Sequence, residues 1–288
     1  MIGLIKLARP KQWIKNLLVI TAPLAAGSLF DHGVLGWTVL AFVCFSLASS
    51  AIYMFNDIRD VEADRAHPKK QHRPIASGRV KPATATVAAI VCGLASFGVP
   101  LLLGNRPLTL VIVSYLALQI GYVFYLKYEP VFDIAAIAAG FLLRAIAGGA
   151  ASDVPISNAF LIVVGFGSLF MAVGKRYSEI REQDGSAKTR AVLAKYTPGY
   201  LQMMLGVSAA IALVGYILWA FEIVESSSAS IPYASLSIIP FTLAMMRYAR
   251  DAEQAKAEAP EDAVFADKAL LVLGLIWLLL FVGQVWQR

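Results

Sequence analysis

Cysteine, histidine and charged residues are all scarce in this chain. Its 288 residues include 2 cysteines and 3 histidines, and only 15% are charged. Cys44 and Cys92 form no Cys-x-x-Cys pair, and His67 and His72 lack the spacing of paired zinc ligands. The sequence therefore favours neither a disulfide framework nor a zinc site. Soluble domains carry about 25% charged residues, so apolar surface replaces much of the usual charged surface here.

Long apolar stretches take the place of the missing charge, and hydrophobic residues make up 58% of the chain. About 20 apolar helical residues cross a ~30 Å hydrocarbon core. Nine stretches approach this length, near 14–30, 34–55, 83–103, 107–126, 132–150, 156–174, 200–222, 231–248 and 266–286. A soluble bundle would need polar outer faces, which these stretches mostly lack. We expect an all-α integral membrane protein with nine transmembrane helices, forming one domain over residues 1–288.

Basic residues are divided unevenly between alternate connections. One set of loops holds 22 of the 25 lysines and arginines, and it comprises 1–15, 56–82, 127–131, 175–198 and 247–268. The positive-inside rule then places the N-terminus in the cytoplasm and the C-terminus outside a cytoplasmic (inner) membrane. The basic segment before the first apolar run could also belong to a cleaved signal peptide, although it equally suits a retained first helix. No nucleic-acid-binding motif competes with the membrane interpretation.

An acidic cluster follows the second apolar stretch. On a helix, Asn56, Asp57, Asp60 and Asp64 share about a quarter of the circumference. Carboxylates crowded in this way repel one another unless a cation sits among them. We therefore predict a divalent-metal site at the membrane surface, with these four side chains as ligands, suited to a phosphorylated substrate.

The loop after the cluster carries cations that can pair with phosphate. Lys70 and Arg73 lie within a segment that Pro68, Pro74 and Gly78 should stiffen and turn back toward the third apolar stretch. Arginine binds phosphate oxygens bidentately, and Mg²⁺ prefers carboxylate and phosphate oxygens together. The alternative is a solvated loop whose basic residues only set the topology.

A second polar group follows the sixth apolar stretch. It contains Lys175, Arg176, Tyr177 and Glu179, a set that suits the phosphate and hydroxyls of a sugar phosphate. Lys175 and Glu179 are also spaced as a simple surface ion pair. Lys15, Lys127 and Arg144 are weaker candidates for substrate binding. A charge such as Arg144 inside a span costs at least ~2.5 kcal/mol, so it is either a hydrogen-bond hub or a substrate contact.

Two motifs resemble those of a known family. Asn56-Asp57-x-x-Asp60-x-x-x-Asp64, followed by Arg73-Pro74-Ile75-Ala76-Ser77-Gly78, resembles the signature of the UbiA superfamily of intramembrane prenyltransferases. The resemblance covers essentially the whole chain. It implies a nine-helix bundle whose active-site cleft faces the cytoplasm, in which Asp57, Asp60 and Asp64 are the catalytic residues that hold Mg²⁺, or Mn²⁺, on a diphosphate.

One departure from the superfamily narrows the resemblance. Prenyl-transferring members usually carry a second motif, DxxxD, where this chain reads Gly174-Lys175-Arg176-Tyr177-Ser178-Glu179. The chain is similar instead to the decaprenyl-phosphate phosphoribosyltransferase branch, also through Arg9–Asn16 and Leu143–Gly149. That branch implies transfer of 5-phosphoribosyl from 5-phosphoribosyl 1-diphosphate to a polyprenyl phosphate, for synthesis of a cell-wall arabinan precursor.

In that branch, Lys175, Arg176, Tyr177 and Glu179 would bind the ribose phosphate, and Lys70, Arg73 and Lys127 the diphosphate or the lipid phosphate. Two alternatives remain open. A UbiA-type prenyltransferase with a prenyl diphosphate donor and a small or aromatic acceptor would keep the fold. An ion-coupled transporter would more typically show broken helices at the membrane midplane. A homo-oligomer is possible in either case.

Overall fold

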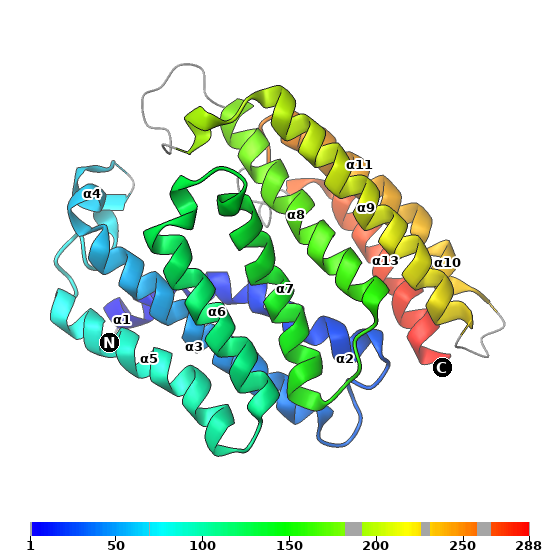
Figure 1. The fold of residues 1–288 in the computed structure, drawn as a ribbon, viewed down its shortest axis with the longest axis horizontal. Coiled ribbons are helices and arrows are strands. Elements are labelled where there is room, and N and C mark those ends of the chain that lie inside the picture. Colours follow the sequence, from blue (N-terminus) through cyan, green and yellow to red (C-terminus); the bar gives the residue numbers. More distant parts are fainter. Residues whose placement is uncertain (1, 69, 182–191, 226–230, 258–265, 288) are drawn as a thin grey trace. The chain divides into compact units, whose positions relative to one another are not determined.

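A computed structural model describes residues 2–68, 70–181, 192–225, 231–257 and 266–287. Within these residues every regular element is a helix (Figure 1). The chain forms two compact units. Unit 1 comprises Met1–Phe124 and Leu143–Pro155, and unit 2 comprises Tyr125–Leu142 and Ile156–Arg288. The single domain expected from the sequence stays a prediction.

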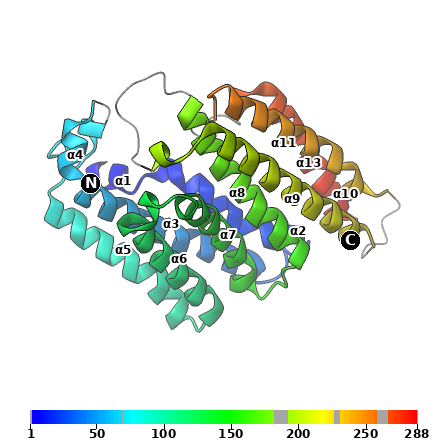
Figure 2. The same ribbon diagram turned by 45° about the horizontal axis from the view of Figure 1, so that its top comes forward.

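Unit 1 is built around one long apolar helix. Its elements are α1 (Ile2–Leu7), η1 (Pro10–Ile20), α2 (Thr21–Ala25), α3 (Val34–Arg59), α4 (Val61–Ala66), η2 (Lys70–His72), α5 (Pro82–Leu102), α6 (Arg106–Phe124) and the second half of α7 (Phe132–Ser152). Helices α5 and α6 pack against α3 and against each other (Figures 1 and 2). Phe45 of α3 is fully buried, and its ring contacts Tyr115 of α6 at 5.0 Å between centroids.

Close backbone approach in unit 1 depends on one glycine of α7. A Cβ added to Gly148 would collide with the carbonyl oxygen of Val19. Small residues let helices pack closely in this way. Gly167 in α8 differs, because a Cβ there would meet nothing within 4 Å.

Unit 2 contains the first half of α7, η3 (Leu126–Tyr128), α8 (Asn158–Arg181), η4 (Leu193–Lys195), α9 (Pro198–Glu225), α10 (Tyr233–Leu236), α11 (Ile238–Glu253) and α13 (Lys268–Trp286). Helices α8 and α9 pack along each other, and α11 contacts α8, α9 and α13. Tyr248 of α11 anchors this packing. Its ring lies against Gly174 of α8, where an added Cβ would come within 2.7 Å of it.

Seven of the described helices are long and apolar enough to span a membrane: α3, α5, α6, α7, α8, α9 and α13. Large apolar side chains remain exposed along them, including Leu94 at 58% and Leu275 at 57%. Lipid is the medium in which such exposure is stable. The chain is a multi-pass membrane protein.

Two of the nine expected spans are interrupted in the structure. Residues 14–30 form the end of η1 and the short α2, and 231–248 is divided between α10 and α11, which meet at Ser237. The Ser237 hydroxyl bonds the carbonyl oxygen of Ala234 and the hydroxyl of Tyr216, so the break has its own polar partners. The count of nine continuous transmembrane helices is therefore not confirmed for the described residues.

Candidate active site

The acidic cluster lies where α3 gives way to α4. Asn56 and Asp57 lie in the last turn of α3, and Asp64 lies in α4. Asp60 stands between the two helices with φ −93° and ψ 12°, outside helical geometry. The sequence predicted one continuous helix here, and that expectation is wrong at Asp60. Because the helix is interrupted at Asp60, helical spacing does not tell which carboxylates lie close together. Their hydrogen-bond partners do.

One arginine joins two of the carboxylates. Nη1 of Arg73 donates to Oδ1 of Asp57 at 3.0 Å and to Oδ2 of Asp64 at 2.7 Å. Both aspartates are buried, each 2% exposed. Two buried carboxylates that flank one cation form a strong charge-assisted contact. Arg73 therefore belongs to the same cluster as the acidic residues, as the sequence motif implies.

Arg9 supplies a second cation to the cluster. Its guanidinium donates to Oδ1 of Asp57 and lies 4.9 Å from the ring centroid of Tyr53. Arg9 has a positive φ of 52°, which is uncommon for a residue with a side chain. Its position just before η1 brings the N-terminal segment of unit 1 onto the end of α3.

The donor set in this cluster suits a hard cation in part. Amide Nδ2 of Asn56 donates to Oδ2 of Asp60 at 3.0 Å. Asp57 Oδ2 and Asp64 Oδ1 accept no hydrogen bond from the described residues, so each aspartate keeps one oxygen for another ligand. No group of three or more Asp, Glu, His or Cys side chains is close enough in the described part to hold a metal alone. Mg²⁺ is commonly held by one or two carboxylates together with substrate phosphates, so the residues present fit that mode.

The loop after α4 is packed onto unit 1. Ile75 and Val80 are 1% and 7% exposed and join Leu7 and Met54 in one apolar cluster. Gly78 has φ 75°, in the region that favours glycine, which confirms the predicted turn. Lys70 is exposed in η2, and its backbone N–H donates to His67 Nδ1 at 3.3 Å. Lys69 lies outside the described residues. Arg73 is thus held by a fixed loop, and Lys70 projects from the same loop.

Arg144 forms a polar network within unit 1. Nε of Arg144 donates to Oδ1 of Asn16 at 2.7 Å, and Nη2 donates to the Tyr115 hydroxyl at 2.9 Å. Arg144 is 6% exposed, and its guanidinium also lies over the rings of Tyr115 and Phe45. These contacts describe a hydrogen-bond hub, the first of the two roles considered for Arg144. Lys15, next to Asn16 on η1, is half-buried.

Unit 2 carries a buried ion-pair network at the start of α7 and the end of α8. Nε of Arg176 donates to Oδ2 of Asp133 at 2.8 Å, and its Nη1 donates to Oε2 of Glu179 at 2.8 Å. The hydroxyl of Tyr196 donates to the other oxygen of Asp133 at 2.6 Å. Arg176 and Asp133 are 1% and 0% exposed. Burial and the bond to Asp133 raise the pKa of Tyr196, so its hydroxyl stays protonated and can donate.

The other predicted residues of unit 2 have different surroundings. Tyr177 is 4% exposed within an apolar cluster that includes Phe170 and Tyr248. Lys175 is half-buried on α8. Lys127, in η3, lies 5.2 Å from the ring centroid of its neighbour Tyr128. The structure thus brings Arg176 and Glu179 together, and it places Tyr177 among apolar side chains.

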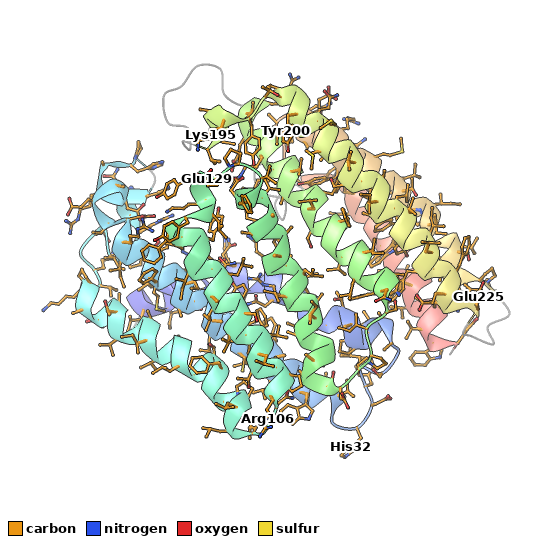
Figure 3. The ribbon with its side chains drawn as sticks, in the orientation of Figure 1. His32, Arg106, Glu129, Lys195, Tyr200 and Glu225 are labelled. Carbon is orange, nitrogen blue, oxygen red and sulfur yellow. The ribbon has the colours of Figure 1, made fainter. Side chains whose placement is uncertain are left out.

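An exposed polar pair lies beside the buried network. Glu129 and Lys195 are 3.9 Å apart and 63% and 50% exposed. Lys195 also donates to the carbonyl oxygen of Tyr128 at 3.0 Å. Figure 3 shows Lys195 and Tyr200 next to Glu129. This end of unit 2 therefore combines a buried charged network with a solvated ionic rim.

A family model identifies the fold to which these features belong. The model of the UbiA prenyltransferase family matches residues 17–266. The chain belongs to the UbiA family. The resemblance to this family that Asn56–Asp64 and Arg73–Gly78 carry is therefore confirmed.

Curated relatives of this UbiA chain match it over nearly its full length. It is 44% identical to decaprenyl-phosphate phosphoribosyltransferase of Corynebacterium glutamicum, across 99% of this chain and 87% of the relative. It is 46% identical to the protein of the same name from Mycobacterium tuberculosis, across 96% of this chain and 92% of the relative. It is 45% identical to the protein of the same name from Mycolicibacterium smegmatis, across 96% of this chain and 90% of the relative.

Solved structures confirm the UbiA fold at lower identity. A UbiA homolog from Archaeoglobus fulgidus bound to DMAPP and Mg²⁺ superposes with a TM-score of 0.71 at 18% identity, covering 99% of this chain and 98% of that one. Digeranylgeranylglyceryl phosphate synthase gives a TM-score of 0.69 at 20% identity, with 98% and 97% coverage. At these identities the likeness concerns the fold alone.

Sequence reasoning missed three residues of these clusters as site members. Arg9 pairs with Asp57 across 48 positions, and Asp133 pairs with Arg176 across 43. Tyr196 reaches Asp133 from 63 positions away. Asp133 lies at the start of an apolar stretch of the sequence. Its full burial is the sign of a structural role, and no local sequence pattern reveals it.

Proposed function

We propose that this UbiA-family chain transfers a 5-phosphoribosyl group from 5-phosphoribosyl 1-diphosphate to a polyprenyl phosphate such as decaprenyl phosphate, releasing diphosphate. The observation that carries the proposal is the near full-length match, at 44–46% identity, to three relatives named decaprenyl-phosphate phosphoribosyltransferase. The product is then a lipid-linked ribose phosphate, a precursor class suited to cell-wall arabinan synthesis.

The end of α8 supports this assignment over prenyl transfer. A prenyl diphosphate donor would call for a second acidic pair there. Instead, Arg176 is bonded to Asp133 and Glu179, and Lys175 stands beside it. In the proposal, Lys175 and Glu179 bind the ribose 5-phosphate and hydroxyls. Arg176, which is fully buried and doubly paired, chiefly positions Glu179, and Tyr177 contributes through packing.

Unit 1 supplies the groups for the donor's diphosphate. A divalent cation, Mg²⁺ or Mn²⁺, would be held by one or two of the carboxylates of Asp57, Asp60 and Asp64 together with the donor's own diphosphate oxygens, with Asn56 beside them, and it would neutralise diphosphate charge when bound. Arg9 and Arg73 hold Asp57 in place and add positive charge around it. Positive charge fixed in advance stabilises the negative charge that develops as the C1–O bond to diphosphate breaks.

The acceptor phosphate needs little activation. The second pKa of a phosphate monoester is near 6, so its oxygen is largely ionised at neutral pH. Attack at C1 on the face opposite the leaving diphosphate forms the new C1–O bond with inversion. No side chain has to remove a proton in this step. Lys70 and Lys127 are the candidates for contacting the lipid phosphate.

The membrane topology follows the same proposal. The soluble donor would be met in the cytoplasm, the side to which the positive-inside rule assigns the loops 56–82 and 175–198. The N-terminus would then be cytoplasmic and the C-terminus extracytoplasmic. An Arg79→Cys variant tests this arrangement in intact cells with a thiol reagent that does not cross the membrane. Labelling of position 79 from outside the cell would contradict it.

A metal-titrated transfer assay tests the proposed chemistry. Purified protein in neutral detergent is given labelled 5-phosphoribosyl 1-diphosphate and polyprenyl phosphate, and label in the organic phase is counted. We expect transfer that depends on Mg²⁺, is lost with EDTA, and falls by at least about 100-fold in Asp57→Asn, the scale seen when one key electrostatic group is removed. Glu62→Gln is the matched control, because Glu62 is 89% exposed on α4. Equal activity of Asp57→Asn and Glu62→Gln would contradict the proposal.

A further inference from the structure

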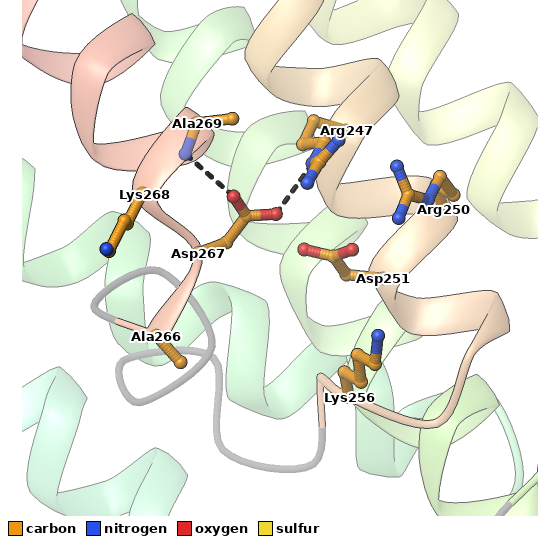
Figure 4. Close-up of a pocket in the computed structure, with 8 residues that line it drawn as sticks. All are labelled: Arg247, Arg250, Asp251, Lys256, Ala266, Asp267, Lys268 and Ala269. Atoms are coloured by element: carbon orange, nitrogen blue, oxygen red, sulfur yellow. Dashed lines mark hydrogen bonds and ion pairs between the residues drawn. The ribbon is translucent and has the colours of Figure 1, made fainter.

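A cationic pocket in unit 2 lies apart from the residues assigned to the reaction. It has a volume of about 770 Å³ and is formed where α11 ends and α13 begins (Figure 4). Its charged lining residues are Arg247, Arg250, Lys256 and Lys268, together with Asp251 and Asp267. Four cations against two carboxylates leave a net positive charge. A pocket of this size and sign suits an anionic group such as phosphate.

The floor of the pocket is rigid. Arg247 donates to Oδ2 of Asp267 at 2.6 Å, and Oδ1 of Asp267 accepts from the N–H groups of Ala269 and Leu270, capping α13. Asp251 is 3% exposed, and Figure 4 shows it on α11 near Arg250, with Lys268 on the far side of Asp267. Arg247 and Asp267 are therefore committed to each other, and they hold the two helix ends in place.

The rim of the pocket carries cations that the floor does not neutralise. Arg250, Lys256 and Lys268 are exposed, and among the described residues none of them forms an ion pair within 4.0 Å. The turn that carries Lys256 is tied down, because the N–H of Ala257 donates to the Ser178 hydroxyl on α8 at 3.0 Å. The rim thus presents positive charge from a fixed backbone, which limits the entropy lost on binding.

The pocket borders an apolar surface. Met246 on α11, one residue before Arg247, is 66% exposed, and Val272 and Leu275 on α13 are 55% and 57% exposed. Helix α13 is one of the candidate membrane spans, so its N-terminal end marks a membrane boundary. Cations directly beside a lipid-facing apolar surface match a molecule with an anionic head and an apolar tail.

We propose that this pocket binds the phosphate headgroup of an anionic membrane lipid, with Arg250, Lys256 and Lys268 as its phosphate contacts. The acyl chains lie along the exposed apolar side chains of α11 and α13. The proposal does not rest on the transferase reaction, and it is tested by binding without turnover.

A lipid-binding assay with matched variants tests the proposal. Fluorescent phosphatidylglycerol is titrated into purified protein in neutral detergent, with fluorescent phosphatidylcholine as the uncharged comparison. The triple variant Arg250→Gln, Lys256→Gln, Lys268→Gln is compared with Lys6→Gln, Arg79→Gln, Lys81→Gln, which removes the same charge from exposed residues of unit 1. We expect a loss of phosphatidylglycerol affinity of roughly 100-fold in the first variant only, since each of the three cations contributes about fivefold.

Three results would overturn the proposal. They are equal losses in the two triple variants, no loss in either, and displacement of the lipid by inorganic phosphate at concentrations comparable to those of the lipid. The last result would assign the pocket to a soluble phosphate compound. If the pocket triple variant does not fold, the single variants decide the matter, with about fivefold weaker binding expected in each. Wild-type affinity in all three single variants would also contradict the assignment.

Discussion

The ion-pair network of Arg176 makes a quantitative prediction about stability. Arg176 and Asp133 are 1% and 0% exposed and 2.8 Å apart. Removing one partner of a buried pair leaves an uncompensated charge and costs about 3–5 kcal/mol. In Asp133→Asn, Glu179 remains 2.8 Å from Arg176 and retains half of the pairing. We therefore expect a loss of about 3 kcal/mol, at the lower end of that range.

A double-mutant cycle measures this network directly. Asp133→Asn, Arg176→Gln and the double variant are unfolded by SDS titration in mixed micelles. If the two residues act as a pair, the double variant should lose less than the sum of the single losses, by about 1–3 kcal/mol. Lys195→Gln is the control from the same unit, because the Lys195–Glu129 pair is exposed and should be worth less than about 1 kcal/mol.

Two results would refute a stabilising network around Arg176. Additive losses in the cycle, or a loss in Asp133→Asn no larger than that in Lys195→Gln, would refute the network as a stabilising unit. The KM for the donor distinguishes two roles of Arg176, namely positioning Glu179 and contacting the donor directly. Conservative replacement by Arg176→Lys should raise the donor KM less than Glu179→Gln does if Arg176 acts by holding Glu179 in place.

Other predictions concern single positions in either unit. Because the folded chain holds the Tyr196 proton more tightly than the unfolded chain, stability should fall as pH rises above the ordinary pKa of 10.0, and Tyr196→Phe should flatten this fall in an unfolding titration. Gly148→Ala should lower the free energy of unfolding by about 1–3 kcal/mol, and with it the thermal midpoint, because the added methyl group overpacks against Val19. Gly167→Ala should leave the thermal midpoint unchanged or raise it slightly. Arg144→Met should lower the free energy of unfolding by about 1–3 kcal/mol for each buried partner left unpaired. The donor KM should stay unchanged. A raised donor KM would show that Arg144 contacts the substrate.

Apolar length was the part of the sequence that predicted structure best. Seven of the nine expected stretches form single helices that can span a membrane. Their length and hydrophobicity decide the outcome, since lipid allows only structures whose backbone hydrogen bonds are satisfied internally. The other two stretches form shorter pieces in the structure. Hydropathy averages over such breaks and therefore does not locate them.

The acidic motif shows what the spacing of residues along a helix can and cannot predict. Helical periodicity placed Asn56, Asp57, Asp60 and Asp64 on one face, but it assumed one continuous helix. The break at Asp60 changes the directions of the side chains, and Asp57 and Asp64 meet through Arg73. Arg9 and Arg73 supply positive charge beside two of these carboxylates, and the divalent-metal site stays a prediction.

Long-range pairs were beyond sequence reasoning. Arg9 and Asp57 are 48 residues apart, and nothing in the local pattern around either residue indicates the other. Arg176 was assigned to substrate from its charge alone, whereas its burial against Asp133 appears only when α7 and α8 are folded. Such contacts depend on tertiary packing, and a motif predicts a residue's chemistry more readily than its partner.

The identity of the group that is transferred tests the central claim most directly. Wild-type protein is supplied with polyprenyl phosphate and either 5-phosphoribosyl 1-diphosphate or a prenyl diphosphate with an aromatic acceptor, and the lipid products are identified by mass spectrometry. The proposed function predicts polyprenyl phosphate extended by one phosphoribosyl group, formed only with the phosphoribosyl donor. A prenylated aromatic product, with no phosphoribosyl lipid from well-folded protein, would contradict it.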